Sequence, residues 1–169
     1  MFLIMRAIVV ILLLKALPYL AYGASSASIT VGGVVKPVEQ IQVTPQPGHD
    51  DLNLTDGGNF IVALVNEKSN SRNGYTVTIT SRNAPSGTSS HSFLIGSANG
   101  SKPIAYTLKY GQQGLEKEVS LKNGTALLNT SSVRTSVDGI SKVLKIGIPK
   151  GAPSPDIYQD LLVLTLASN

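Results

Sequence analysis

Hydrophobic and polar residues alternate in short runs along the chain from residue 25 onward. The runs include "SASITVGGVV", "IQVT", "NFIVALV", "GYTVTIT", "IAYTLKY", "KEVSL", "KVLKIGI" and "DLLVLTL", and they are rich in β-branched residues. A period of two residues is typical of a strand with one buried face. No amphipathic helical pattern follows residue 24, so the sequence predicts an all-β fold.

Residue pairs that favour tight turns separate these runs. Glycine after Asp or Asn accepts the positive φ that such turns require. The pairs are Asp56-Gly57, Asn73-Gly74, Asn99-Gly100, Asn123-Gly124 and Asp138-Gly139. Short strands with frequent turns predict a sandwich or a barrel.

The last run has apolar residues on both faces. In a strand, Leu162, Leu164 and Leu166 point one way, following Tyr158 and Asp160, while the residues between them point the other way. The leucines are expected to belong to the core in any β fold. The other apolar face indicates that this strand also needs close neighbours around it.

The first 23 residues have the features of an export signal. "MFLIMR" places one cation before the apolar run "AIVVILLL", and small residues at Ala21 and Gly23 suit a cleavage site. Lys15 and Pro18 interrupt the run, which makes it too short for a membrane span. We therefore expect residues 1–23 to be a signal peptide that directs export, with cleavage after Gly23.

The charge and the cysteine count narrow the function classes. The net charge is +4, but no short window is dominated by Lys and Arg, so no nucleic-acid partner is predicted. The chain has no cysteine, which excludes a disulfide framework and thiol chemistry. The fold must therefore be held by its core and by strand pairing.

Residues suited to catalysis are few. His49, Asp50 and Asp51 form the cluster most like a metal site, but adjacent residues in a loop point apart, and a solvated loop is the favoured interpretation. His91 is flanked by serines without a nucleophile-elbow motif. We predict no catalytic residue, no metal site and no cofactor, and we expect that the protein is not an enzyme.

The run from Ser25 to Lys36 has no local partner in the sequence. It is free of proline and precedes the first turn signal. One possibility is that it donates a strand to another chain, which would supply the neighbour that the last strand needs. The alternative is an ordinary first strand of a complete sandwich.

The C-terminal sequence "IGIPKGAPSPDIYQDLLVLTL" resembles the end of spore coat protein U domains and archaic chaperone-usher pilins. In that family a loop leads to Tyr-x-Asp, here Tyr158-Gln159-Asp160, and then to an alternating apolar last strand. "NGYTVTITS" and "PIAYTLKYG" are similar to its middle strands. The chain departs from the family in having no cysteine and in having Ile157 where a glycine commonly precedes the tyrosine.

The resemblance implies an incomplete immunoglobulin-like β-sandwich of the pilin type, at residues 37–169, that is completed by a donor strand. Residues 24–36 would be the donor extension, in which Ile29, Val31 and Val35 fill pockets and Gly33 allows close backbone approach. Tyr158 and Asp160 would fix the start of the last strand, and Leu162, Leu164 and Leu166 would line the acceptor groove.

The implied function is that of a structural subunit of a chaperone-usher pilus or surface fibre, exported through the periplasm to the cell surface. Its partners would be neighbouring copies or homologous subunits, a periplasmic chaperone and an outer-membrane usher, with a host or abiotic surface as a further possible partner. The alternative is a self-contained secreted binding module or coat protein. The sequence leaves open whether the N-terminal strand is donated or pairs within its own chain.

Overall fold

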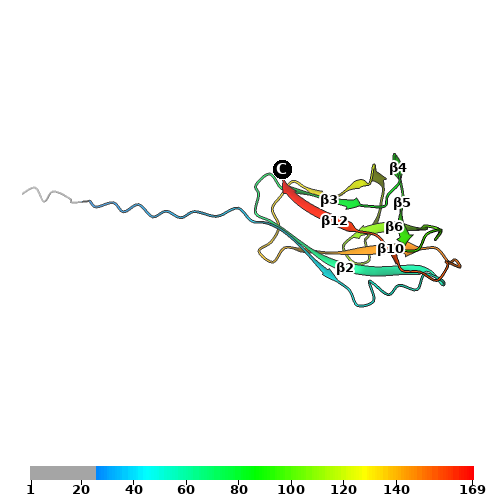
Figure 1. Ribbon diagram of the computed structural model, residues 1–169. Helices are drawn as coiled ribbons and strands as arrows, with labels where there is room; N and C mark the ends of the chain where they lie inside the picture. The colour runs from blue at the N-terminus through cyan, green and yellow to red at the C-terminus, as the bar shows by residue number, and fades with distance from the viewer. Residues whose placement is uncertain (1–25) are drawn as a thin grey trace, which may run out of the picture. The chain divides into compact units, whose positions relative to one another are not determined.

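Strands form all the regular secondary structure in residues 26–169, which are the residues described by the computed structural model (Figure 1). The all-β prediction is therefore confirmed for this range. No helix within it is long and apolar enough to cross a membrane. The predicted signal peptide lies outside the described residues.

The strands form two antiparallel sheets. The larger sheet has the order β1-β2-β10-β6-β5-β11, with β7 also paired to β6. Its strands are β1 (Glu39–Pro45), β2 (Gly58–Ser69), β5 (His91–Gly96), β6 (Ile104–Gly111), β7 (Lys117–Val119), β10 (Ile140–Ile148) and β11 (Tyr158–Gln159).

The smaller sheet has the order β12-β3-β9-β8-β4. Its strands are β3 (Tyr75–Ser81), β4 (Thr88–Ser89), β8 (Leu121–Lys122), β9 (Thr125–Ser131) and β12 (Leu162–Ser168). One apolar core contains residues of both sheets, among them Val65 and Leu108 of the larger sheet and Ile79 and Leu121 of the smaller sheet. This arrangement is consistent with a β-sandwich.

The predicted turn glycines have positive φ. They are Gly57, Gly74, Gly100, Gly124 and Gly139. At Gly74, between β2 and β3, φ is 81°, and an added Cβ would lie only 1.8 Å from the carbonyl oxygen of Ser131. Glycine is therefore required there both for its backbone conformation and for the close approach of the β9 end.

Two of the expected runs are divided by the fold. "KEVSL" is split between β7, which pairs with β6, and β8, which pairs with β4 and β9, so the chain changes sheets near Ser120. The run that begins at Tyr158 is also split. Tyr158 and Gln159 pair with β5 in the larger sheet, whereas the residues from Leu162 onward pair with β3 in the smaller sheet.

A buried carboxylate joins the two sheets inside the core. Glu67 of β2 is fully buried, and its Oε1 accepts a hydrogen bond of 2.5 Å from the Tyr110 hydroxyl. Its Oε2 accepts hydrogen bonds from the Tyr75 hydroxyl at 2.9 Å and from Nδ2 of Asn129 at 2.7 Å. Burial, together with the Glu67 carboxylate, raises the pKa of both tyrosine hydroxyls, so they remain proton donors at neutral pH.

The folded unit comprises residues 36–169. Asn70 fixes its first residues, because Asn70 Nδ2 donates to the Lys36 carbonyl at 2.8 Å and Asn70 Oδ1 accepts from the Val38 amide at 2.8 Å. Residues 26–35 form a separate unit without a strand, and all are exposed.

Candidate functional site: an apolar groove between two edge strands

Two edge strands of different sheets flank an open groove. β1 pairs only with β2, and β12 pairs only with β3, so each has one edge without a backbone partner in the described part of the chain. The groove between them, called the β1–β12 groove below, has a volume of about 640 Å³. Unpaired strand edges present rows of free N–H and C=O groups, which another strand can bind.

The floor of the β1–β12 groove is the apolar core itself. Its floor residues come from three strands of the larger sheet and are Val62, Ala63, Leu94, Leu144 and Ile146. Val43 and Pro45 of β1 line one side, and Leu162 and Leu164 of β12 line the other. The groove is therefore an opening into the core and differs from a polar depression on a closed surface.

Alternation along β12 sets which side chains line the groove. Leu162, Leu164 and Leu166 are partly buried, whereas Leu161 and Val163 remain 47% and 49% exposed. Leu162 and Leu164 pack against the core, as predicted for the inward face. Leu166 lies on the same face but is not among the residues that line the groove.

The opposite side of the groove was not predicted. "IQVT" was expected to form a strand, and β1 places Val43 in the groove with 42% of its surface exposed. Pro45 at the end of β1 is the sequence signal that could have identified an edge strand, because proline cannot donate a hydrogen bond within a sheet.

Asp160 fixes the chain where it passes into β12. Its Oδ2 accepts hydrogen bonds from the hydroxyls of Ser81 at 2.6 Å, Tyr106 at 2.5 Å and Ser92 at 3.2 Å. Because Ser81 lies in the smaller sheet and the other two lie in the larger sheet, this carboxylate joins the sheets beside the groove. Burial and the Asp160 carboxylate raise the pKa of the Tyr106 hydroxyl, which therefore stays a donor.

The same carboxylate interrupts the strand that was expected to run on from Tyr158. Asp160 Oδ1 accepts hydrogen bonds from the amides of Leu161 at 2.7 Å and Asn83 at 3.2 Å. The Leu161 carbonyl accepts from the Arg82 amide at 3.1 Å. Asp160 therefore lies in a link between β11 and β12 that is bonded to the end of β3.

Tyr158 and Asp156 hold the preceding loop. The Tyr158 hydroxyl donates to the Ser154 carbonyl at 3.1 Å, and its ring packs against the core. Asp156 accepts hydrogen bonds from the hydroxyls of Ser101 and Ser97, both at 2.5 Å, and from the Ala98 amide at 2.9 Å. These donors hold the pKa of the Asp156 carboxyl well below its usual range.

One end of the groove, called the mouth below, is acidic. His49, Asp50, Asp51 and Asp156 all line the groove together with Leu162. The His49 ring is held by the Gln46 carbonyl, 2.9 Å from Nδ1, and lies 3.7 Å from Oδ1 of Asp50. No group of three or more metal-ligating side chains is arranged to hold an ion in residues 26–169.

At the other end, called the base below, β1 and β12 come together. The Ser168 hydroxyl donates a hydrogen bond to Oε1 of Glu39, the first residue of β1. The C-terminus and the start of β1 therefore lie at the same end of the domain (Figure 1). The groove opens from this contact toward the mouth.

The predicted donor residues lie in residues 26–35. Ile29, Val31 and Val35 are 88%, 87% and 85% exposed. An added Cβ at Gly33 would meet no atom within 4 Å. Four apolar or small positions at a spacing of two residues are thus presented on a segment without backbone pairing.

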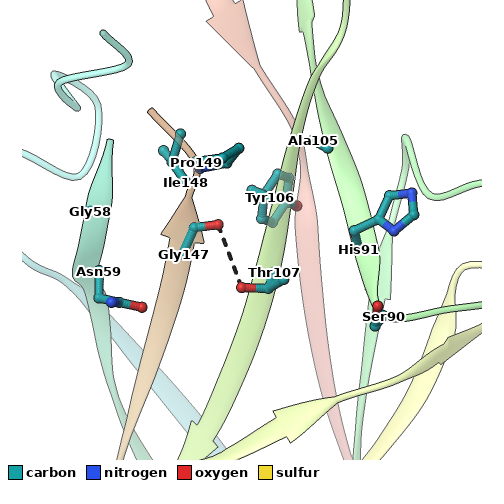
Figure 2. Close-up of a pocket in the computed structure, with 10 residues that line it drawn as sticks. All are labelled: Gly58, Asn59, Ser90, His91, Ala105, Tyr106, Thr107, Gly147, Ile148 and Pro149. Atoms are coloured by element: carbon teal, nitrogen blue, oxygen red, sulfur yellow. Dashed lines mark hydrogen bonds between the residues drawn. The ribbon is translucent and has the colours of Figure 1, made fainter. Parts of the chain in front are cut away.

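A second hollow lies over β2, β10, β6 and β5 (Figure 2). It has a volume of about 420 Å³ and is lined by Asn59, Thr107 and His91 among others. At its centre Gly147 is opposite Thr107, whose hydroxyl points to the Gly147 carbonyl 3.5 Å away. The hollow is smaller than the β1–β12 groove and does not lie between two edge strands of different sheets, so the β1–β12 groove is the stronger candidate.

No protein-family model matches the sequence, and no curated protein is similar to it. The groove and the residues that line it are therefore the basis for proposing a function.

Proposed function

We propose that the protein is a structural subunit of a chaperone-usher pilus or surface fibre that polymerises by donor-strand complementation. The observation that carries the proposal is the β1–β12 groove, where the core is open between two unpaired strand edges. In this proposal the domain is an immunoglobulin-like sandwich of the pilin type that lacks one strand.

The proposed occupant is the segment Ala27 to Val35 of another copy or of a homologous subunit. Its alternating Ile29, Val31 and Val35 side chains would enter the groove, and Gly33 would allow close contact with the floor. Register would be fixed by these side chains, because a shift of one residue turns the apolar face outward. Each apolar side chain that becomes fully buried contributes roughly 1.5 to 3 kcal/mol.

The proposal includes export and assembly partners. A signal peptide at residues 1–23 would direct the chain to the periplasm, where a chaperone would cover the groove until an outer-membrane usher incorporates the subunit at the cell surface. An uncovered apolar groove with free strand edges promotes aggregation, which is the physical reason for such a chaperone.

The experiment uses a variant that lacks residues 24–35 and therefore keeps Lys36, whose carbonyl is bonded to Asn70. Its thermal melt is measured with and without the peptide "SASITVGGVVK", which is residues 26–36. At a peptide concentration of 100 times Kd, the expected stabilisation is about 2.7 kcal/mol. A peptide with Ile29→Asp and Val31→Asp is the matched control, and it is expected to give no shift because buried carboxylates would be unpaired.

The alternative function is a self-contained secreted binding module or coat protein. It is favoured by the finding that every buried side-chain polar atom in the described residues has a hydrogen-bond partner without a donor strand. A truncated variant that is a stable monomer and ignores the peptide would overturn the fibre proposal in favour of this alternative.

A further inference from the structure

The base of the domain carries exposed cations. Lys36 lies there through its bond to Asn70, and Arg72 lies in the adjoining turn. Arg134 precedes Thr135, whose amide donates to the Ser69 carbonyl at 2.9 Å, so its loop lies at the same end. All three cations are exposed, and none forms an ion pair with the described residues.

The mouth carries exposed anions. Asp50 and Asp51 are both exposed. Among the described residues, Asp51 has no ion-pair partner, and Asp50 has only His49, 3.7 Å away. His49 carries a charge only when it is protonated. Asp156 and Asp160 also lie at this end, but hydrogen bonds already engage them. The base therefore presents Lys36 and Arg72, beside the exposed anion Glu39, and the mouth presents Asp50 and Asp51 at the opposite end of the β1–β12 groove. Arg82, Lys102 and Lys150 are exposed cations near the mouth, but they do not line the groove.

The direction of β12 decides which chain can supply an antiparallel strand. β12 runs from Leu162 at the mouth to Ser168 at the base. A donor strand that pairs antiparallel to β12 begins at the base and ends at the mouth. Its last apolar residue, Val35, would therefore lie at the mouth of the acceptor. The chain's own Val35 is covalently linked to Lys36, which lies at the base. The base and the mouth are separated by the length of β12, roughly 20 Å at 3.3 Å per residue. An antiparallel occupant must therefore come from a second molecule.

We propose that successive copies dock head to tail through these charges, with Lys36 and Arg72 at the base of the donor against Asp50 and Asp51 at the mouth of the acceptor. This inference rests on the proposed function and adds the charged contact surface of the joint. A parallel donor would instead place its cations against those of the acceptor's base. Opposite charges accelerate docking, and like charges disfavour the wrong polarity.

The test follows assembly of the full mature chain by light scattering at low and high salt. Exposed charges steer association at low ionic strength and are screened at high ionic strength. We expect the wild-type rate to fall about tenfold on going from low to high salt. At low salt, Asp51→Lys should slow assembly by a similar factor, and adding Lys36→Glu in the same chain should restore most of the rate.

Two control variants change the same charges away from the groove. Glu118→Lys on β7 matches Asp51→Lys, and Lys122→Glu on β8 matches Lys36→Glu; all four positions are exposed. The controls should assemble like the wild type. If Asp51→Lys behaves like Glu118→Lys, the docking inference is overturned while the fibre proposal stands. A wild-type chain that does not assemble at any salt concentration overturns both.

Discussion

The two sheets meet in contrasting ways at the Glu67 cluster and along the β1–β12 groove. At Glu67 a buried carboxylate accepts hydrogen bonds from two buried tyrosines and a partly buried asparagine. Along the groove, apolar side chains of the core are only half covered, and two strand edges lack partners. The first region is closed by its own side chains, whereas the second is open and, in the proposed function, is completed by a further strand.

The largest expected effect comes from breaking the Glu67 cluster. Glu67→Ala leaves the buried hydroxyls of Tyr75 and Tyr110 without their carboxylate acceptor, and it leaves the Asn129 amide only the Tyr75 hydroxyl, 3.4 Å away. Each unsatisfied buried group costs about 1 to 3 kcal/mol, so a loss of about 3 to 5 kcal/mol in the free energy of unfolding is expected. Chemical denaturation of the truncated variant measures it.

The control for that prediction is Glu118→Ala, at an exposed glutamate of β7. It should change the free energy of unfolding by less than about 0.5 kcal/mol. Equal stabilities of the two variants would contradict the role given to the Glu67 cluster.

A smaller effect is expected at the boundary between the two regions. Asp160→Asn keeps one acceptor oxygen, but its NH₂ group faces hydroxyls of Ser81, Ser92 and Tyr106 that now donate to the carboxylate. A loss of about 1 to 3 kcal/mol is expected. Because this carboxylate fixes the start of β12, affinity for the peptide "SASITVGGVVK" should also fall, which isothermal calorimetry measures.

Asp138→Asn, at an exposed aspartate that does not line the groove, is the matched control for Asp160→Asn. It should preserve both stability and peptide affinity. A destabilised Asp160→Asn variant that still binds the peptide with wild-type affinity would show that Asp160 stabilises the fold without shaping the groove.

The strands and turns could be predicted because their signals are local. Alternation identified β2, β3, β6, β10 and β12, and glycine after Asp or Asn marked turns that have positive φ. The inward face of β12 also followed from alternation, since a strand exposes every second side chain to one face.

The polar clusters could not be predicted because their partners are distant in the sequence. Asp160 is 54 residues from Tyr106 and 79 from Ser81, and Asn129 is 62 residues from Glu67. In "VNEKS" the charges of Glu67 and Lys68 indicate a solvated segment, yet Glu67 is fully buried. Only the folded arrangement brings enough donors together to bury that carboxylate.

The most direct measurement of the central claim is hydrogen exchange of the β12 amides before and after assembly. In the free subunit, amides of Leu162–Ser168 that point away from β3 have no backbone partner in the described residues and should exchange rapidly. A donor strand bound at this edge should protect them. β4 (Thr88–Ser89), the opposite edge of the same sheet, serves as the internal control and should be unchanged. Protection confined to β12 and the β1–β12 groove is the predicted result, and assembled protein in which β12 exchanges as fast as in the free subunit would contradict donor-strand complementation.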